Sequence, residues 1–424
     1  MTLLGAIPRR CVNLPSGSFS ALLACLFRGQ IVKGENISPF YEEFGKWLGV
    51  ENVIGAATGR SAFHMALEAL DLPKGSRIIF PVFTFPIMPM IAKMLGYEPV
   101  FCPVDPKTFN AGPQHFEPLI TEKTGAVLAT HLFGRLCRIR EIVELCRARN
   151  IPVLEDCAHA CGLRVDGQQA GTFGDIGVFS FAEGKNMPCF GGGAVVTADS
   201  KIAERLRRIE SEARAQESGK LFHEAISIWI KWLLTRPWIF SLTAYRVLRL
   251  KEIFGQSLMD STVGNELLDK FAVSNLRLSR FANLQAAIGR LHLKIIDVFN
   301  QGAQCNAGIL TSELGEVPGI EVPATSGDHL YVYYPLKVDP DKRDDLRGFL
   351  MRHGIDTKTT DMADCSKLKA FQNNPGPKES LRTDETALLE ICVYPDISEP
   401  KIRRIAREIR SWAGLPEIND ANRK

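Results

Sequence analysis

The feature that most limits the possible folds of this chain is a regular alternation of short apolar runs and helical patterns between about residues 50 and 200. The apolar runs are short and end in turn residues, as buried strands do; they are 52–57, 77–81, 99–104, 126–132, 151–154 and 177–181. Helical patterns lie between them, at 61–70, 85–95 and 139–149. This order predicts an α/β fold with a mostly parallel sheet sandwiched by helices. Because ligands of such sheets bind beyond the carboxyl ends of the strands, residues just after a strand are candidates for function.

The rest of the chain predicts a second, smaller unit. A charged helix at 201–218 and an aromatic segment follow the alternation, and the helical stretch 284–314 is of the kind that joins two lobes. Strand and helix patterns then resume on a smaller scale, at 331–338, 343–353, 390–394 and 399–413. We therefore predict a large domain over residues 1–280, with a helical and aromatic insertion at about 222–254. A connecting helix and a small α+β domain make up 281–424.

Composition excludes several classes of protein. The chain has 424 residues and is 45% hydrophobic and 23% charged, which is typical of a globular protein and not of a disordered one. A formal charge of +3 provides no global field for nucleic-acid binding, so we expect no nucleic-acid partner. Eleven scattered cysteines without a CxxC pair argue against a disulfide framework and suit a reducing cytoplasm. We expect no metal site, because His64, His131 and His353 match no metal-ligand spacing.

Two apolar segments share only part of the pattern of a targeting or membrane signal. Arg9 and Arg10 precede the apolar run 21–27, but no small-residue cleavage site follows, so we expect this run to be a face of the first helix. In 225–248, charged residues and Pro237 interrupt the apolar pattern far short of the roughly 20 residues that span a bilayer. The basic, aromatic segment 222–254 instead predicts a helix hairpin broken at Pro237. Such a hairpin could rest on a membrane or grip a lipid-linked substrate, or it could pack on a partner subunit.

The residue types with the clearest chemistry lie between positions 151 and 198. Asp156 ends a predicted strand, His159 follows about one helical turn later, Ser180 lies in the next strand, and Lys185 follows in a loop. A Schiff-base enzyme needs such a lysine, a carboxylate that keeps a pyridine ring protonated, and a hydroxyl for a phosphate. Taken singly, an Asp after a strand is most often a helix cap, and a loop lysine is most often a solvated charge. Their joint arrangement favours the chemical interpretation.

Several ordered motifs in this chain resemble one family, the DegT/DnrJ/EryC1/StrS group of pyridoxal-phosphate (PLP) enzymes. Residues 155–162 match its ED-x-A-[QH]-A-x-G motif, residues 171–181 match G-x-x-G-D-x-x-x-F-S-F, and Lys185 matches its lysine. Weaker matches are 58–67, 81–85, 130–134 and 284–289. The resemblance runs from about residue 31 to residue 414. It implies a fold-type-I PLP transferase with a seven-stranded-type sheet and an active site at a homodimer interface.

The resemblance also implies a role for each catalytic candidate. Lys185 would form the Schiff base with PLP and carry protons between the substrate Cα and C4′ of the cofactor. Asp156 would form a salt bridge with the pyridinium nitrogen, and His159 would flank the ring or hydrogen-bond near its 3′-oxygen.

Four further residues are implied as cofactor-binding residues. Ser180 would hold the phosphate together with the backbone N–H groups of Gly59 and Arg60 at a helix N-terminus. Phe85 would stack on the ring, and simple core packing is the equal alternative for this residue.

The chain departs from the family pattern at three places. Arg60 replaces a threonine, and its guanidinium suits either the phosphate or a substrate anion. Leu278 replaces an asparagine that contacts the phosphate across the dimer, and Asn275 could substitute only if the register shifts by three residues. The stretch 356–365 lacks the aromatic and imidazole groups typical of members that act on sugars.

The predicted function is that of a PLP-dependent aminotransferase. As the resemblance implies, an amino group would pass from glutamate to a keto sugar, nucleotide-linked, in surface polysaccharide or related biosynthesis. A PLP-dependent sugar dehydratase or eliminase is one alternative, although family members that remove a hydroxyl have histidine in place of the lysine. A catalytically silent scaffold or sensor is the other. The expected location is the cytoplasm, with possible membrane association through 222–254.

Overall fold

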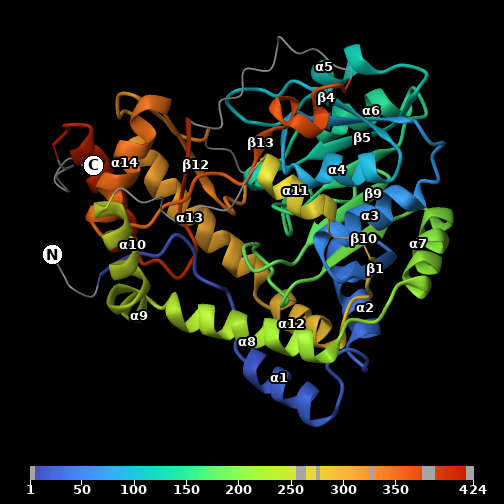
Figure 1. The fold of residues 1–424 in the computed structure, drawn as a ribbon, viewed down its shortest axis with the longest axis horizontal. Coiled ribbons are helices and arrows are strands. Elements are labelled where there is room, and N and C mark those ends of the chain that lie inside the picture. Colours follow the sequence, from blue (N-terminus) through green and yellow to red (C-terminus); the bar gives the residue numbers. More distant parts are fainter. Residues whose placement is uncertain (1–4, 255–263, 274–276, 325–328, 375–386, 417–424) are drawn as a thin grey trace.

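The computed structural model describes residues 5–254, 264–273, 277–324, 329–374 and 387–416. Its centre is a seven-stranded sheet with the strand order β1-β10-β9-β6-β5-β2-β4 (Figure 1). β10 runs antiparallel to both of its neighbours, and the other pairs are parallel, so the predicted mostly parallel sheet is confirmed. The bounds in sheet order are β1 (Asn52–Ala56), β10 (Gly193–Thr197), β9 (Ile176–Ser180), β6 (Val153–Asp156), β5 (Thr124–Thr130), β2 (Arg77–Pro81) and β4 (Glu98–Cys102).

Helices cover both faces of this sheet because its strands are apolar on both sides. Successive side chains of β10 show the alternation: Val195 belongs to one buried cluster and Val196 to another. Phe63 of α3 packs in the first cluster, and Phe40 of α2 packs in the second. The helices of this part are α2 (Ile37–Leu48), α3 (Gly59–Ala69), α4 (Ile87–Met94), α5 (Pro113–Phe116), α6 (Ile139–Arg147), α7 (Ser200–Glu212) and α11 (Asn265–Val273).

Two predicted helices have different bounds in the structure. The helix expected at 201–218 ends at Glu212, because the backbone of Arg214 pairs with the segment before α12, donating to Leu278 O and accepting from Arg280 N. The stretch 284–314 is two helices, α12 (Asn283–Leu293) and α13 (Ile296–Leu314). Ile295 leaves helical geometry there, with φ −129° and ψ −9°. Neither Gly nor Pro marks this break in the sequence.

The C-terminal part contains a smaller antiparallel sheet, which agrees with the predicted α+β character. Its strands are β11 (Ile320–Glu321), β12 (Tyr334–Val338) and β14 (Leu388–Ile391), and α14 (Pro340–Arg352) and α15 (Glu399–Trp412) pack on it. Ile7 from the start of the chain lies in this core, and its backbone pairs with residues 354 and 356. β13 (Ala363–Asp364) pairs with β3 (Phe83–Thr84), and Asp361 and Met362 just before it line the same cavity as the ends of the large sheet's strands. The boundary at residue 280 stays a prediction.

The segment 222–254 is helical and broken at Pro237 as predicted, but it contains three helices and not the two of the predicted hairpin. Pro237 is the first residue of α9 (Pro237–Leu242), which follows α8 (Ser218–Leu234) and precedes α10 (Ala244–Ile253). The apolar run 21–27 lies in α1 (Ser18–Phe27). Among the described residues, no helix is both long and apolar enough to cross a membrane. The remaining elements are a hairpin of β7 (Arg164–Val165) and β8 (Gln168–Gln169) and the 3₁₀ helices Glu117–Leu119, Leu132–Gly134, Cys365–Lys367 and Lys369–Phe371.

Candidate active site

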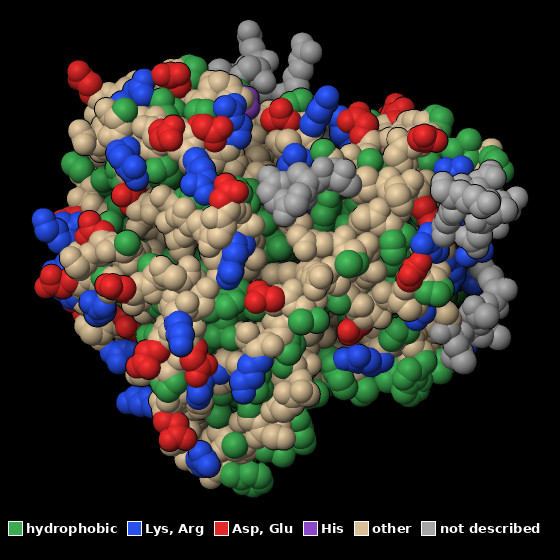
Figure 2. Space-filling model, turned by 180° about the vertical axis from the view of Figure 1, so that it is seen from behind, with side chains coloured by type: hydrophobic (Ala, Val, Ile, Leu, Met, Phe, Trp, Pro, Cys, Tyr) green, Lys and Arg blue, Asp and Glu red, His purple; other side chains and the backbone are tan. Residues whose placement is uncertain are grey.

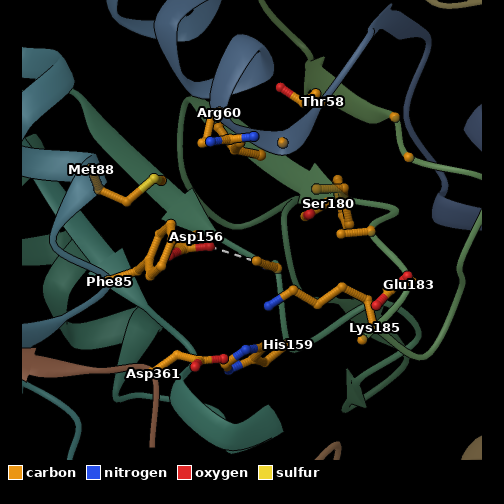
Figure 3. A pocket seen from close by; sticks show the side chains of 18 of the residues that line it. Thr58, Arg60, Phe85, Met88, Asp156, His159, Ser180, Glu183, Lys185 and Asp361 are labelled. Atoms are coloured by element: carbon orange, nitrogen blue, oxygen red, sulfur yellow. Dashed lines mark hydrogen bonds between the residues drawn. The ribbon is translucent and has the colours of Figure 1, made fainter. Parts of the chain in front are cut away.

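A cavity of about 520 Å³ lies at the carboxyl ends of β5, β6 and β9, beside the N-terminus of α3. All of the residues singled out from the sequence line it, although they come from separate segments of the chain (Figure 3); they are Gly59, Arg60, Phe85, Asp156, His159, Ser180 and Lys185. Asp156 and Ser180 end their strands and Lys185 follows β9, so these three polar side chains share one space, as expected at the carboxyl edge of a parallel sheet.

Lys185 lies on a loop after β9 that is held from both sides. The Tyr333 hydroxyl donates to Gly184 O at 2.9 Å, and the amide nitrogen of Asn186 donates to Cys161 O at 2.6 Å and to Asn300 Oδ1 at 2.9 Å. The Nζ atom of Lys185 points into the cavity. Burial lowers the pKa of Lys185 to about 8, although Asp156 and Asp361 act in the opposite direction. A large fraction of this amine is therefore neutral, and nucleophilic, near pH 8.

Asp156 is the last residue of β6 and is buried. Its Oδ1 accepts a hydrogen bond from the backbone N–H of Ala158 at 3.0 Å. Burial raises the pKa of Asp156, while the Ala158 N–H and the nearby Lys185 act to lower it. A buried carboxylate facing a cavity is a good partner for a cationic ring nitrogen, since the pair removes the cost of burying either charge alone.

His159 is buried and neutral. Its Nδ1 accepts a hydrogen bond from the backbone N–H of Phe133 at 3.2 Å, which leaves the ring proton on Nε2. Burial lowers its pKa well below the ordinary value, and the cations Lys185 and Lys358 lower it further. The ring is held by Tyr333, whose edge meets it at a centroid distance of 5.5 Å. His159 therefore presents an uncharged ring to the cavity and can donate from Nε2.

The N-terminus of α3 forms an anion site with Ser180. Thr58 caps the helix by accepting from Ser61 N at 3.1 Å, so the N–H groups of Gly59 and Arg60 belong to the open first turn. A Cβ atom at position 59 would lie 2.6 Å from Ser180 Cβ, so only glycine lets this turn approach the hydroxyl. The Arg60 guanidinium lies 5.8 Å from the Phe271 ring centroid and lines the same cavity. These groups suit a phosphate.

The chemistry of the cavity fits PLP. The anion site, the buried carboxylate of Asp156 and the amine of Lys185 are the three groups that the phosphate, the ring nitrogen and the aldehyde of that cofactor require. The Thr84 and Thr130 hydroxyls line the cavity and are buried without a hydrogen-bond partner among the described residues. Orphaned polar atoms of this kind are typical of a site that a polar ligand completes.

A second polar cluster adjoins the cavity, since its member His131 lines the cavity wall. The cluster consists of His131, Glu155 and Cys157. Each residue offers one ligand atom, and the three atoms lie within 4.8 Å of one another, close enough to hold a metal ion. The Glu155 carboxylate, however, already accepts hydrogen bonds from the N–H groups of Gly171, Phe173 and Gly174 at 2.7–2.9 Å and contacts His131 Nε2 at 3.0 Å. These four contacts use the lone pairs of a carboxylate. The cluster is thus explained as buried structural support for β6 and the loop before β9.

Sequence reasoning missed part of the cavity wall. Arg10 reaches it from the N-terminal segment, Lys231 reaches it from α8, and Asp361 reaches it from the segment that pairs with β3. Asp361 forms an ion pair with Lys358, which lies 3.6 Å from buried Glu390. The sequence signal for Asp361 was the stretch 356–365 itself, which carries charged residues and lacks aromatic and imidazole groups.

Leu278, which stands where the family has an asparagine, has a packing role in this structure. Its side chain packs against the first buried cluster, and its backbone oxygen accepts from Arg214 N at 3.1 Å. An apolar side chain in this position offers nothing to a phosphate. Asn275, the suggested substitute, lies outside the described residues.

Comparison with known proteins agrees with this geometry. Residues 16–238 and 243–410 match the DegT/DnrJ/EryC1/StrS aminotransferase family. The chain is 28% identical over 400 residues to dTDP-3-amino-3,4,6-trideoxy-alpha-D-glucose transaminase of Streptomyces venezuelae, which covers 93% of this chain and 91% of that protein. The structure of S. venezuelae DesV in complex with a ketimine intermediate has a TM-score of 0.71 at 26% identity and covers 95% of each chain.

The structure of ntda from Bacillus subtilis with bound cofactor PMP shares the fold. Its TM-score is 0.71 at 21% identity, with 97% of this chain and 86% of that chain covered. The chain therefore belongs to the DegT/DnrJ/EryC1/StrS aminotransferase family and is a PLP-dependent aminotransferase of fold type I.

Proposed function

We propose that this enzyme transfers an amino group from glutamate to the keto group of a nucleotide-linked sugar, in surface polysaccharide or related biosynthesis. The observation that carries the proposal is the convergence of Lys185, Asp156 and the α3 anion site on one cavity. The S. venezuelae relative, whose name describes a dTDP-sugar transaminase, supports the sugar substrate because the similarity extends over 93% of this chain.

In this proposal the protein residues hold the reactants and move protons. PLP supplies the electron sink when it is bound. Asp156 would keep a proton at the pyridine nitrogen, and the neutral Lys185 amine would accept the proton of the substrate Cα and deliver it to C4′ of the cofactor. His159 would flank the ring with an uncharged edge, and Phe85, which lines the same cavity, would stack on it. Ser180, Gly59 and Arg60 hold the phosphate.

Lysine at position 185 also favours transamination over sugar dehydration. Transfer of nitrogen requires a base that would move the proton from the substrate Cα to C4′ before hydrolysis, and removal of a hydroxyl does not need this base. A silent scaffold has no use for an amine with a pKa of about 8 facing a buried carboxylate. Both observations support an active aminotransferase.

The glutamate half-reaction tests this proposal. The purified protein loaded with PLP is expected to lose its visible absorption band on addition of L-glutamate, because the aminated cofactor absorbs at shorter wavelength. A keto-sugar nucleotide should then restore the band, while D-glutamate serves as the control. A protein that takes up no PLP, or whose spectrum L-glutamate leaves unchanged, would contradict the proposal.

We also propose that the enzyme works as a homodimer in the cytoplasm. The dimer follows from the family resemblance, in which two subunits share the active site, and analytical ultracentrifugation at micromolar concentration tests it. All eleven cysteines are free thiols, which suits a reducing compartment.

We further propose that α8, α9 and α10 rest on an anionic membrane surface. Large apolar side chains point outward along these helices and gather at the lower right edge of the molecule in Figure 2; they are Ile230, Leu233, Leu234, Trp238, Leu242, Val247, Leu250, Ile253 and Phe254. Arg246, Arg249 and Lys251 lie among them on α10, where the acidic Glu252 pairs with Arg352. An apolar face with surplus positive charge is complementary to anionic lipid headgroups.

Vesicle flotation tests this surface. Wild-type protein is expected to float with vesicles of phosphatidylcholine and phosphatidylglycerol and to float less with phosphatidylcholine alone. The triple substitution Trp238→Ser, Leu250→Ser and Ile253→Ser should abolish flotation, because it removes apolar area that is at least 55% exposed. Val298→Ser on α13, at a position 73% exposed, is the matched control. Equal flotation of the triple variant, or its dissociation from a dimer into monomers, would reject membrane contact.

A further inference from the structure

Three charged side chains that line the cavity, and that the cofactor chemistry does not use, contact one another. Arg10 Nη2 lies 2.8 Å from one oxygen of Glu183, and Lys231 Nζ lies 2.7 Å from the other. All three residues line the cavity, and Glu183 lies beside Lys185 in Figure 3. We call Arg10, Glu183 and Lys231 the Glu183 cluster.

The fold holds this cluster in place from three directions. The neighbouring Arg9 makes an ion pair with buried Asp356 at 2.7 Å, which fixes the N-terminal segment. A Cβ atom at Gly184 would lie 3.3 Å from Arg10 Nη1 and 2.9 Å from the Tyr333 hydroxyl, so the loop packs closely against both side chains. The cluster is therefore pre-organised before any ligand arrives.

The third element that positions the cluster is helix α8, which carries Lys231. Glu224, Ser227, Ile228 and Lys231 all line the cavity, and their spacing puts them on one helix face. Glu224 lies two turns from Lys231, about 10 Å along the helix axis. Glu224 therefore adds a negative charge to the same cavity wall, two turns from Lys231.

Two cations on one carboxylate leave the cluster with one net positive charge. The side chains of Arg10 and Lys231 are still 44% and 47% exposed, whereas that of Glu183 is 20% exposed. A guanidinium has five N–H donors and an ammonium has three, so each cation keeps donors for a second acceptor. The two oxygens of one carboxylate contact both cations, so the cations lie close together. Two linked anionic groups can therefore contact both cations at once.

We propose that the Glu183 cluster binds the diphosphate of the sugar substrate, with Arg10 and Lys231 each donating to one phosphate. This inference rests on the proposed function and names residues that recognise the carrier of the sugar. A sugar attached to this diphosphate extends inward toward Lys185, two residues beyond Glu183. The diphosphate ester comes from a nucleotide or from a lipid. The exposed apolar residues Ile230 and Leu233 next to Lys231 make the lipid source a real alternative.

Isothermal titration of the PLP-loaded protein tests the inference with UDP, inorganic pyrophosphate, UMP and farnesyl diphosphate as probes. Arg10→Gln and Lys231→Gln are each expected to raise the Kd for UDP by about tenfold or more, as for loss of a charge-assisted hydrogen bond. Glu183→Gln should act in the opposite direction and lower the Kd, because it removes the competing carboxylate. Lys220→Gln is the matched control, since Lys220 is an exposed cation on α8 outside the cavity.

The sign of the Glu183→Gln effect separates a binding role from a structural one. If the cluster only ties α8 to the Lys185 loop, all three substitutions weaken binding or leave it unchanged, and the inference is wrong. It is also wrong if the wild type binds neither UDP, pyrophosphate nor farnesyl diphosphate, or if Lys220→Gln weakens binding as much as Lys231→Gln. Melting temperatures check that each variant is folded, and Lys231→Gln at an exposed helix position carries the test if Arg10→Gln does not fold.

The probes also identify the carrier. Tighter binding of UDP than of farnesyl diphosphate supports a nucleotide, the reverse supports a lipid, and equal binding supports recognition of the diphosphate alone. The glutamate half-reaction involves no diphosphate, so it still proceeds if this inference fails and the proposed function holds.

Discussion

Lys185→Ala is expected to lower kcat/KM for amino transfer by at least about two to four orders of magnitude, the contribution of a positioned acid–base group. If these residues have the proposed roles, the loss should be in kcat, because the lysine would act on the reacting proton while Ser180, Gly59 and Arg60 would still hold the phosphate. Borohydride reduction followed by peptide mass analysis should label Lys185 in the wild type and no residue in the variant.

Two further variants make this result specific. Lys185→Arg keeps a cation but stays protonated at every working pH, so it should be as inactive as Lys185→Ala. Lys201→Ala, at an exposed position of α7, should have wild-type activity. Full activity of Lys185→Arg, or labelling of another lysine, would remove the basis of the mechanism.

The pH dependence of the apoenzyme follows from the same amine. Burial lowers the pKa of Lys185 to about 8, so the neutral, nucleophilic fraction is small at pH 6.5 and dominant at pH 9.5 on the ordinary titration curve. The rate of covalent PLP attachment to apoenzyme should therefore rise with pH and level off above about pH 8, where an unperturbed lysine, with a pKa of about 10.4, would still be rising.

Glu155→Ala is expected to lower the free energy of unfolding by about 3–5 kcal/mol, the cost of breaking a buried charged network. Glu155 is fully buried and accepts from three backbone N–H groups and contacts His131. Burial alone lowers the pKa of His131, but Cys137, Cys157 and Glu155 together outweigh it and raise this pKa well above the ordinary value. Removal of the carboxylate leaves these donors unpaired in the core.

Urea unfolding followed by circular dichroism measures this effect. Glu155→Gln should lose less stability than Glu155→Ala, because its carbonyl oxygen can still accept some of these bonds. Glu122→Ala, at an exposed glutamate, should stay within about 0.5 kcal/mol of wild type. A loss below about 1 kcal/mol for Glu155→Ala would show that the network contributes little to stability.

The local sequence pattern was enough to predict most strands of the large sheet. The strand predicted at 77–81 is β2 (Arg77–Pro81), because a short apolar run closed by proline has few other structures open to it. The break of the insertion at Pro237 was predictable for the same reason, since proline has no N–H and a fixed φ. The end of α7 at Glu212 was not, because it depends on pairing with residues about 65 positions later in the chain.

The sequence by itself determined the order of the elements and the chemical types at the strand ends, Asp156, Ser180 and Lys185 among them. Only the tertiary structure decided that Gly59 touches Ser180, that Glu155 closes a buried network, and that Arg10 and Lys231 meet on Glu183. The physical reason is range: helix and strand periodicity is encoded within a window of a few residues. Burial, pKa and charge pairing depend instead on which distant segments the packed core brings together.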